Sequence, residues 1–356
     1  MNFDLTDDRQ MLSDSLRRYL ADNCGMEHRN KSAYEAPFHD PKAWTELAAL
    51  GIPGALVSEE AGGYGGTGFD ITVVFEELGR VLCPEPFLAT LLASRLLSAA
   101  GADQEALIEG ATRYAVAFSE IDEPYDAAFM STTARASGDA YMLDGRKTAV
   151  YGGHVADTLL VIAQLDGKPA VFQTEASAAT VTGYGMMDGG GAAEVVFDGT
   201  PATLLIADAE AAITDMLAAG RLALCAEAVG AMDTANALLL DYLKTRKQFG
   251  TVIGKFQVLQ HRAVDLLSEI EQARSMTIAL AACLGEPEAA RTSAMAKSLV
   301  GRVARLVGEE TIQMQGGIAM TWEYASSHYA KRLVMLDHQL GDTDACEGEI
   351  VRSYAA

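Results

Sequence analysis

The sequence predicts an α+β protein in which a helical first third, a middle third of short β-strands and a helical last third follow one another. Apolar residues recur at helical spacing up to about residue 112, alternate in short runs from about residue 113 to residue 207, and then return to long helical patterns. These three textures predict an N-terminal helical domain over residues 1–112, an antiparallel β domain over residues 113–207 and a four-helix bundle over residues 208–356.

Two apolar patterns predict helices in the first third. The first set is Met11, Leu12, Leu16, Tyr19 and Leu20, and the second set is Ile71, Val74, Phe75, Leu78 and Val81. Between them lies the segment SEEAGGYGGTG, residues 58–68. A phosphate-binding glycine loop follows a buried strand, opens a helix at its last glycine and carries Lys-Ser or Lys-Thr, and this segment does not. The sequence therefore favours a turn between helices over a phosphate site here.

The middle third contains short apolar runs that indicate strands. They are residues 115–118, 141–143, 159–162, 170–172 and 195–197. Asp-Gly pairs stand between them at Asp144-Gly145, Asp166-Gly167 and Asp198-Gly199, and this dipeptide suits the two-residue turns of hairpins. A small antiparallel β domain is therefore expected, with its end near Ala207.

The last third contains four helical patterns. They cover roughly residues 209–246, 256–284, 288–315 and 324–339. Alanine-rich faces, together with Gly220 and Gly230 inside the first pattern, favour close packing of these helices. The sequence therefore predicts a four-helix bundle.

Charge and composition exclude several classes of partner. The chain has 49 carboxylates against 27 Lys and Arg residues, a formal net charge of -22 and a pI near 4.6, which argues against nucleic acid or an anionic membrane as partner. Acidic residues lie close to Met1 and no uninterrupted apolar run follows, so a signal peptide is not expected and a cytoplasmic location is. The five cysteines are far apart and form no CxxC pair, which is typical of reduced structural thiols, and no metal site is expected.

One small basic island stands out in this acidic chain. It is KTRKQFG, residues 244–250, at the end of the first bundle pattern. A cationic helix C-terminus that opposes the macrodipole is one interpretation. A local site for an anionic ligand is the other, because Arg246 offers the planar, permanently charged guanidinium that suits a phosphate.

The sequence resembles the flavin-dependent acyl-CoA dehydrogenases along nearly its whole length. The motifs that carry the resemblance, in the order of that family, are FDLTDDRQMLSDSLRRYL, then GIP with SEEAGGYGG and FEELGR, then LDGRK, then RKQFG with GKFQVLQ, and finally QMQGG followed by TWEY. Several motifs in register are far more specific than any one of them. The resemblance implies an N-terminal helical domain, a middle β-barrel-like domain and a C-terminal four-helix bundle, assembled as tetramers around FAD.

The resemblance also implies residues that would contact the FAD of a neighbouring chain. Arg246 matches an arginine that reaches the neighbour's pyrophosphate, with Gln248 and Phe249 beside it. A glutamine and a glycine pair of the family match Gln313, Gly316 and Gly317. Glycine is needed where backbone must approach a ligand closely.

The elements with which family members hold their own flavin are altered in this chain. The resemblance places a Thr-Glu-Pro run at residues 118–122, where Phe118 and Ser119 are weaker candidates for flavin contact. A Trp-Ile-Thr segment is replaced by Ala149-Val150-Tyr151, so Tyr151 is a third weak candidate and the aromatic platform is lost.

The catalytic base is missing from both positions that the family uses. Counted from QMQGG and TWEY, the glutamate that takes the α proton in most members falls on Leu340, and the alternative position on the first bundle helix falls on Gly220. Neither residue can accept a proton. Asp342 is a weak substitute, because Asp342, Asp344, Glu347 and Glu349 are also expected to form a solvated acidic tail.

The residues that would contact a neighbour's FAD are present, whereas those for the chain's own flavin and for the base are altered or missing. This difference favours a partner subunit. The resemblance implies one chain of an FAD-dependent acyl-CoA dehydrogenase, which desaturates an acyl-CoA thioester, with a longer catalytic chain as partner in an α2β2 tetramer. Such pairs act on bulky substrates such as sterol side chains. A self-sufficient homotetramer that uses Asp342 as base and a non-catalytic acyl-CoA binding or scaffold protein are the alternatives.

Overall fold

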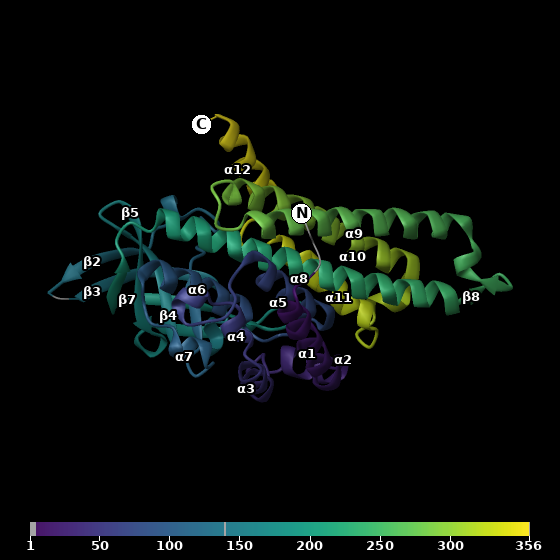
Figure 1. Ribbon diagram of the computed structural model, residues 1–356, viewed down its shortest axis with the longest axis horizontal. Helices are drawn as coiled ribbons and strands as arrows, with labels where there is room; N and C mark the ends of the chain where they lie inside the picture. Colours follow the sequence, from purple (N-terminus) through teal and green to yellow (C-terminus); the bar gives the residue numbers. More distant parts are fainter. Residues whose placement is uncertain (1–4, 139, 356) are drawn as a thin grey trace. The chain divides into compact units, whose positions relative to one another are not determined.

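The computed structural model describes residues 5–138 and 140–355 of the chain (Figure 1). The α-helices are α1 (Asp7–Asn23), α2 (Met26–Tyr34), α3 (Pro41–Ala49), α4 (Ile52–Ala55), α5 (Gly68–Val81), α6 (Phe87–Ala100), α7 (Glu105–Ile108), α8 (Glu210–Thr245), α9 (Gln257–Cys283), α10 (Ala289–Gln315), α11 (Ala325–Asp337) and α12 (Thr343–Ala355). The strands are β1 (Tyr114–Ala117), β2 (Thr133–Ser137), β3 (Ala140–Tyr151), β4 (Thr158–Leu165), β5 (Lys168–Glu175), β6 (Thr180–Gly185), β7 (Gly191–Ile206), β8 (Lys247–Gln248) and β9 (Thr251–Val252).

The chain divides into two compact units. The bundle unit consists of the described residues of Met1–Met26, Thr72–Cys83 and Arg221–Ala356, and the sheet unit consists of Glu27–Ile71 and Pro84–Gly220. Helices of the first third contribute to both units. The order of a helical part, a β part and a second helical part agrees with the predicted fold class, whereas the domain boundaries at residues 112 and 207 stay a prediction.

The sheet unit is built around a seven-stranded sheet with the order β1-β4-β2-β3-β7-β5 and with β6 beside β7. Because β5 also pairs with β4, the strands from β4 to β5 form a closed ring, as the barrel-like prediction requires. Most pairings are antiparallel, but β4 runs parallel to both β1 and β2. The predicted antiparallel, barrel-like domain is confirmed as a fold class, with the parallel pairs located at β4.

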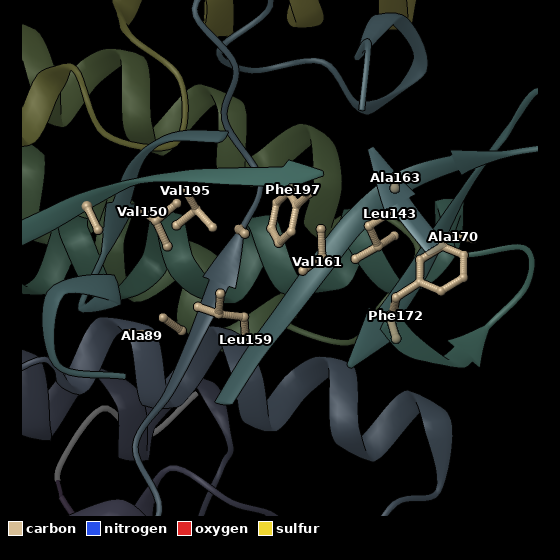
Figure 2. Close-up of a cluster of buried hydrophobic side chains, with 14 residues drawn as sticks. Ala89, Leu143, Val150, Leu159, Val161, Ala163, Ala170, Phe172, Val195 and Phe197 are labelled. Carbon is tan, nitrogen blue, oxygen red and sulfur yellow. The ribbon is translucent and has the colours of Figure 1, made fainter. Parts of the chain in front are cut away.

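A cluster of buried apolar side chains fills this sheet unit (Figure 2). Alternate residues of β4, namely Leu159, Val161 and Ala163, point to the cluster, as the two-residue period of a strand requires. Helix α6 adds Ala89, and Phe172 of β5 is fully buried. Burial of a side chain as large as Phe172 contributes about 1.5–3 kcal/mol, so this cluster stabilises the sheet unit.

Only one of the three Asp-Gly pairs forms a hairpin turn. Asp166-Gly167 joins β4 to β5, and both residues have the positive φ, 51° and 82°, that a type I′ turn needs. Asp144-Gly145 and Asp198-Gly199 instead lie inside β3 and β7, where the register shifts. The carboxylate of Asp144 accepts a hydrogen bond of 2.8 Å from the backbone of Gly199 across this bulge. These two Asp-Gly pairs therefore form a β-bulge, and the hairpin turns predicted at them were wrong.

The four predicted bundle helices are α8, α9, α10 and α11, and each begins and ends within two residues of its predicted bounds. Helices α1 and α5 of the first third belong to the same unit and match their two apolar patterns. Glycine allows α5 and α8 to touch, because a methyl group at Gly230 would lie 2.0 Å from the carbonyl oxygen of Glu76. The predicted role of Gly230 in close helix packing is confirmed.

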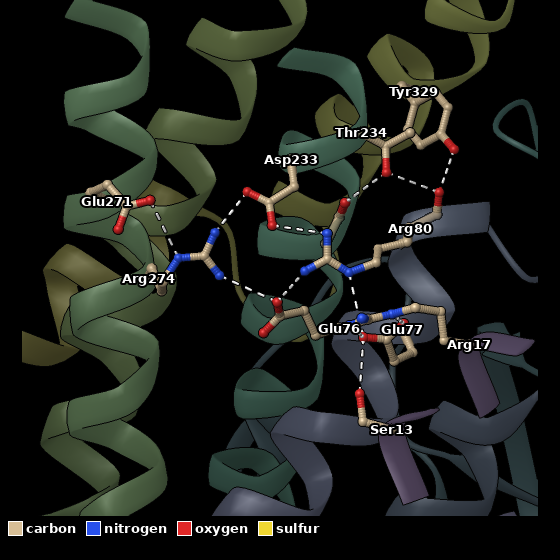
Figure 3. A network of polar contacts seen from close by, with 11 residues as sticks. Ser13, Arg17, Glu76, Glu77, Arg80, Asp233, Thr234, Glu271, Arg274 and Tyr329 are labelled. Carbon is tan, nitrogen blue, oxygen red and sulfur yellow. Dashed lines mark hydrogen bonds and ion pairs between the residues drawn. The ribbon is translucent and has the colours of Figure 1, made fainter. Parts of the chain in front are cut away.

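A network of ion pairs joins α5, α8 and α9 on the polar side of this contact (Figure 3). Arg80 of α5 pairs with Glu76 at 2.6 Å and with Asp233 of α8 at 3.0 Å. Arg274 of α9 pairs with Asp233 at 2.7 Å and with Glu76 at 3.3 Å. Two guanidinium groups thus share two carboxylates, and a network of this kind contributes more than isolated surface pairs do.

The segment SEEAGGYGGTG forms a tight turn, as predicted, that packs on its own preceding backbone. A Cβ atom at Gly63 would lie 2.2 Å from the carbonyl oxygen of Val57, and one at Gly65 would lie 2.2 Å from that of Ala55. These glycines are explained by packing within the turn.

Helix α8 is long and apolar enough to cross a membrane by composition, but 78% of its apolar window is buried within the protein. A buried core helix passes the same test.

All five cysteines are free thiols in the structure, and Cys24, Cys225 and Cys346 are buried.

Candidate functional site

The basic island forms a small exposed hairpin at the end of α8. Strands β8 and β9 pair around Phe249 and Gly250, whose φ values are 53° and 76°. A bulky side chain at positive φ is unfavourable, and Asn is the residue that suits this turn position. Phe249 is nevertheless 90% exposed. Its ring meets that of Phe256 edge to face, with centroids 6.1 Å apart, and the rest of the ring surface is open to contact with another molecule.

Arg246 lies at the base of this hairpin. Its backbone NH donates to Tyr242 at 2.8 Å, and its carbonyl oxygen accepts from Ile253 at 2.9 Å, so its backbone position is defined. The side chains of Arg246 and Gln248 are exposed. The guanidinium forms no ion pair with any residue that the structure describes. It is therefore available for an anionic ligand.

The second predicted set lies at the end of α10. Gln313 is exposed on the last turn, and Gly316 has φ 73° and ψ -157°, a combination that essentially only glycine adopts. Apart from the glycines' own chain neighbours and helix backbone, no atom of the described residues lies within 4 Å of the place that a Cβ would take at Gly316 or Gly317. The backbone here is open to close approach by a ligand.

Both sets lie at one end of the bundle. The chain runs up α8, back along α9, up α10 and back along α11, so the end of α8 and the end of α10 share one end of the unit (Figure 1). A guanidinium, an exposed aromatic ring and open glycine backbone fit the pyrophosphate and adenine parts of FAD.

The predicted base position lies in a strained turn after α11. Leu340 is buried and has a φ of 55°, and Gly341 follows with a φ of 109°. The Nε atom of Arg221 donates to the carbonyl oxygen of Leu340 at 2.8 Å. A methyl group at Gly341 would lie 2.9 Å from Nη2 of Arg221. The turn is held in an unfavourable conformation and carries an apolar side chain.

Two buried cations hold this turn in place. Lys297 is 2% exposed and donates to the carbonyl oxygens of Asp337 and Gly341, each at 2.7 Å. Arg221, 3% exposed, forms a bidentate pair of 2.6 and 2.7 Å with Glu349. Burial lowers the pKa of Lys297 and outweighs the attraction of Cys225 and Asp337 nearby.

The predicted acidic tail is a helix, in which Asp344 and Glu347 are exposed as expected. Residues 343–355 form helix α12, and the carboxylate of Asp342 accepts a 2.8 Å hydrogen bond from the backbone of Ala345, as an N-cap does. Asp344 lies in the first turn, where the helix dipole favours it, and Glu349 pairs with Arg221. The acidic residues here serve the helix, and Asp342 is already engaged.

The alternative base position, Gly220, is a buried glycine within α8. It offers no titratable group.

The weaker candidates lie in the sheet unit, at the end of β1 and along β3. Phe118 is buried, and its carbonyl oxygen accepts from Nζ of Lys147 at 2.9 Å. Ser119 accepts from the backbone of Thr148 at 2.9 Å, and Tyr151 is half-buried at the end of β3. The structure thus joins Phe118 and Ser119 to β3.

A buried ion pair that the sequence reasoning missed anchors this segment. Lys147 is fully buried and donates to Glu120 at 2.9 Å. Burial raises the pKa of Glu120, but hydrogen bonds from Ser131, Thr132 and Lys147 outweigh it and lower this pKa to about 2. Burial lowers the pKa of Lys147 to about 8 despite the attraction of Glu120. Lys147 is the last residue of the LDGRK segment and lies among the apolar residues of β3, and this position was the signal that could have revealed the pair.

A cavity of about 540 Å³ lies in the sheet unit between α6 and the first turns of α8. Arg95 and Asp215, which form a bidentate pair of 2.7 Å each, make its polar wall, and Leu56 and Ile206 line it as well. None of the predicted site residues lines this cavity. The described residues also contain no group of three or more His, Cys, Asp or Glu side chains that could hold a metal ion.

Comparison with known proteins identifies the family. A family model described as "Acyl-CoA dehydrogenase, N-terminal domain" matches residues 6–106, and one described as "Acyl-CoA dehydrogenase, C-terminal domain" matches residues 210–350. The chain is 31% identical over 332 residues to acyl-CoA dehydrogenase IpdE2 of Mycobacterium tuberculosis, covering 92% of this chain and 91% of that protein.

Solved structures agree in fold. The structure titled "Tcur3481-Tcur3483 steroid ACAD G363A variant" has 27% identity and a TM-score of 0.90 over 98% of both chains. The ChsE4-ChsE5 complex of Mycobacterium tuberculosis, at 22% identity, has a TM-score of 0.91 over 100% of this chain and 99% of that chain.

The predicted family, fold class, enzyme class and cofactor are therefore confirmed at the level of the family. The chain belongs to the acyl-CoA dehydrogenases, FAD-dependent oxidoreductases that act on acyl-CoA thioesters.

Proposed function

We propose that this chain is one subunit of a heteromeric acyl-CoA dehydrogenase, in which it completes the FAD site of a longer partner chain and the partner supplies the catalytic base. The α2β2 composition and the cytoplasmic location predicted from the sequence are part of this proposal.

The observation that carries the proposal is the buried leucine at the predicted base position. Desaturation needs a carboxylate that takes the proton from the carbon α to the thioester. FAD, when bound, supplies the acceptor for the hydride that leaves the β carbon. Here Arg221 and Lys297 donate hydrogen bonds that hold the turn in place, yet the side chain of Leu340 contains no proton acceptor. The turn that carries the base in most family members is therefore present, but the carboxylate that would take the proton is missing.

The exposed end of the bundle supports a role toward a neighbour. Phe249 is exposed at a strained turn position, Arg246 is available for an anion, and Gly316 keeps a backbone conformation reserved for glycine. The positive φ values of Phe249 and Gly316 are unfavourable for most residues, and Arg246 is exposed, so a ligand held by another chain would account for them together. Phe118 and Ser119, candidates for contact with the chain's own flavin, already accept hydrogen bonds within the chain through their backbone carbonyl groups. The third candidate, Tyr151, is half-buried.

A self-sufficient homotetramer with Asp342 as base is the second candidate. The capping bond between Asp342 and Ala345 disfavours it, because a general base must be free to receive the proton. A non-catalytic acyl-CoA binding or scaffold protein is the third candidate, and it would not need the exposed Phe249.

We propose a bulky, steroid-derived acyl-CoA as the class of substrate. The support is the 27% identical structure whose title names a steroid ACAD.

The decisive experiment measures the ratio of flavin to protein, by absorbance of released cofactor, for this chain alone and after co-expression with longer acyl-CoA dehydrogenase chains of the source organism. About one FAD per pair of chains in the complex, and little in the chain alone, is the expected result. Arg246→Met should lower flavin retention in the complex by about tenfold or more through loss of a charge-assisted phosphate contact. Arg302→Met, at another exposed arginine of the bundle unit, is the control.

About one FAD per chain, with acyl-CoA oxidation by the chain alone, would refute the heteromer. Absence of flavin from every preparation would instead favour the scaffold protein.

A further inference from the structure

The cavity between α6 and the first turns of α8 has no part in the proposed function. Its volume of about 540 Å³ lies within the range of about 300–1,000 Å³ that is usual for sites of small organic ligands. Short side chains leave this space open, because Ala99 of α6 and Ala211 and Ala212 of α8 stand on its walls. Ala99 and Ala211 are exposed, so a ligand can enter from solvent.

The cavity lies on the side of α8 that faces away from the alternative base position of the family. Ala211 and Gly220 are nine residues, or about two and a half turns, apart and therefore lie on opposite sides of the helix. Gly220 shares its side with Ile213, which lies about two turns earlier and is 3% exposed. The cavity is therefore separate from the place where a thioester would meet a base at position 220.

The charged groups on the cavity wall are already paired. Nε and Nη2 of Arg95 donate to the two carboxylate oxygens of Asp215, each at 2.7 Å. Asp208 also lines the cavity, and Nζ of Lys168 lies 2.5 Å from its carboxylate. An anionic ligand would meet two carboxylates and one guanidinium that is already engaged, so these charges favour an uncharged ligand.

The remaining wall combines hydroxyl groups with apolar side chains. Ser58 stands at the N-cap of a 3-10 helix but makes no capping bond with its side chain. The hydroxyl of Ser98 accepts 2.8 Å from Nε2 of Gln104, and of the described residues none accepts from it, so its hydrogen can donate to a ligand. Leu56 and Ile206 supply apolar contact. This lining suits a mostly apolar molecule with a few hydrogen-bonding groups.

We propose that this cavity binds a rigid, uncharged polycyclic alcohol or ketone of about steroid size. A rigid ring system loses less conformational freedom on binding in an open cavity than a flexible chain does. Its hydroxyl or carbonyl group would take the place of water at Ser58 and Ser98. The site does not depend on the proposed heteromer, because every lining residue belongs to the sheet unit of this one chain.

The test measures binding of testosterone to the full chain by equilibrium dialysis. Testosterone is an uncharged steroid with one ketone and one hydroxyl group. We expect one molecule per chain with a dissociation constant of about 100 µM or below. Testosterone sulfate has the same rings but carries a negative charge, and it should bind at least about tenfold more weakly because Asp208 and Asp215 line the cavity.

Three variants locate the bound steroid. Ala99→Phe fills the cavity and should raise the dissociation constant by at least about tenfold. Ser98→Ala removes one hydrogen-bonding group and should raise it by about threefold to tenfold. Ala136→Phe is the matched control, because Ala136 is an exposed alanine of β2 that does not line the cavity, and it should change the constant by less than about twofold.

Three results would overturn the proposal. The first is absence of binding by the wild-type chain at about 100 µM testosterone. The second is binding that Ala99→Phe leaves unchanged, which would place the steroid elsewhere on the chain. The third is displacement of testosterone by saturating octanoyl-CoA, which would assign the steroid to the thioester site. The heteromer is judged by the ratio of flavin to protein, so these results leave it unaffected.

Discussion

Replacement of Lys147 by Met is expected to destabilise the sheet unit strongly. The Nζ atom of Lys147 donates to the carbonyl oxygen of Phe118 and to Glu120, each at 2.9 Å, from a fully buried position. Met has a similar length and fills the space but donates nothing. The change therefore isolates the loss of the charged donor from the loss of packing volume.

The size of the effect follows from what the change leaves behind. Removal of one partner of a buried ion pair costs about 3–5 kcal/mol, because the other charge stays buried without compensation. Glu120 keeps hydrogen bonds of 2.6 and 2.7 Å from Ser131 and 3.0 Å from Thr132, which favours the lower end of this range. With a urea dependence of about 3 kcal/mol/M, a loss of about 3 kcal/mol moves the unfolding midpoint down by about 1 M urea.

The assay is urea unfolding followed by far-UV circular dichroism at pH 7. Lys168→Met is the matched control, because Lys168 pairs with Asp208 at 2.5 Å and both side chains are more than half exposed. An exposed pair contributes about 0–1 kcal/mol, so this control should shift the midpoint by no more than about 0.3 M. Equal midpoints for Lys147→Met and the wild type would refute the reasoning that the buried pair holds this segment.

The pH dependence gives an independent check on Glu120. Its pKa is lowered from 4.5 to about 2 in the folded chain, so the folded state binds fewer protons than the unfolded state between these values. The stabilisation from Glu120 is complete above about pH 4.5 and is lost as pH falls toward about 2. In the Glu120→Gln variant, the free energy of unfolding should depend less on pH between about pH 2 and pH 4.5. An unchanged slope of stability against pH would contradict the assignment.

Three further predictions concern the site. Asp342→Asn should leave turnover of the holo-complex within about twofold, because Asn also caps a helix; a hundredfold loss would restore Asp342 as base. Phe249→Ala should lower flavin retention in the complex while the melting temperature stays within about 1 °C of the wild type, since the side chain is 90% exposed; equal flavin content would remove Phe249 from the site. Gly316→Ala should lower both flavin content and melting temperature, because alanine does not adopt φ 73° with ψ -157° without strain; a variant that matches the wild type in both would contradict this.

Helix positions were predictable because periodicity is a local property. The helical patterns of the last third appear as α8 to α11 within two residues of their predicted bounds, since an amphipathic or buried helix repeats its apolar residues every three to four positions. Helix α12 was missed because its first turn is acidic, and the acidic residues that suggested a solvated tail are those that cap and pair the helix. Charge alone does not distinguish a helix start from a disordered end.

The candidate FAD-contacting residues came from motifs, and the structure added their exposure and backbone strain. No pattern in the sequence could reveal that Phe249 lies at positive φ with its ring in solvent, or that Gly316 adopts a conformation closed to other residues. Such properties depend on where the helices end in space.

The family, the order of the secondary-structure elements and the missing carboxylate at position 340 were all readable from the chain, because they depend on residue identity and local spacing. The pairings of Lys147 with Glu120, of Arg221 with Glu349 and of Lys297 with the carbonyl groups around Leu340 were decided by tertiary structure alone. Their partners lie between 27 and 128 residues apart along the chain, and only the fold brings such distant groups within hydrogen-bond reach.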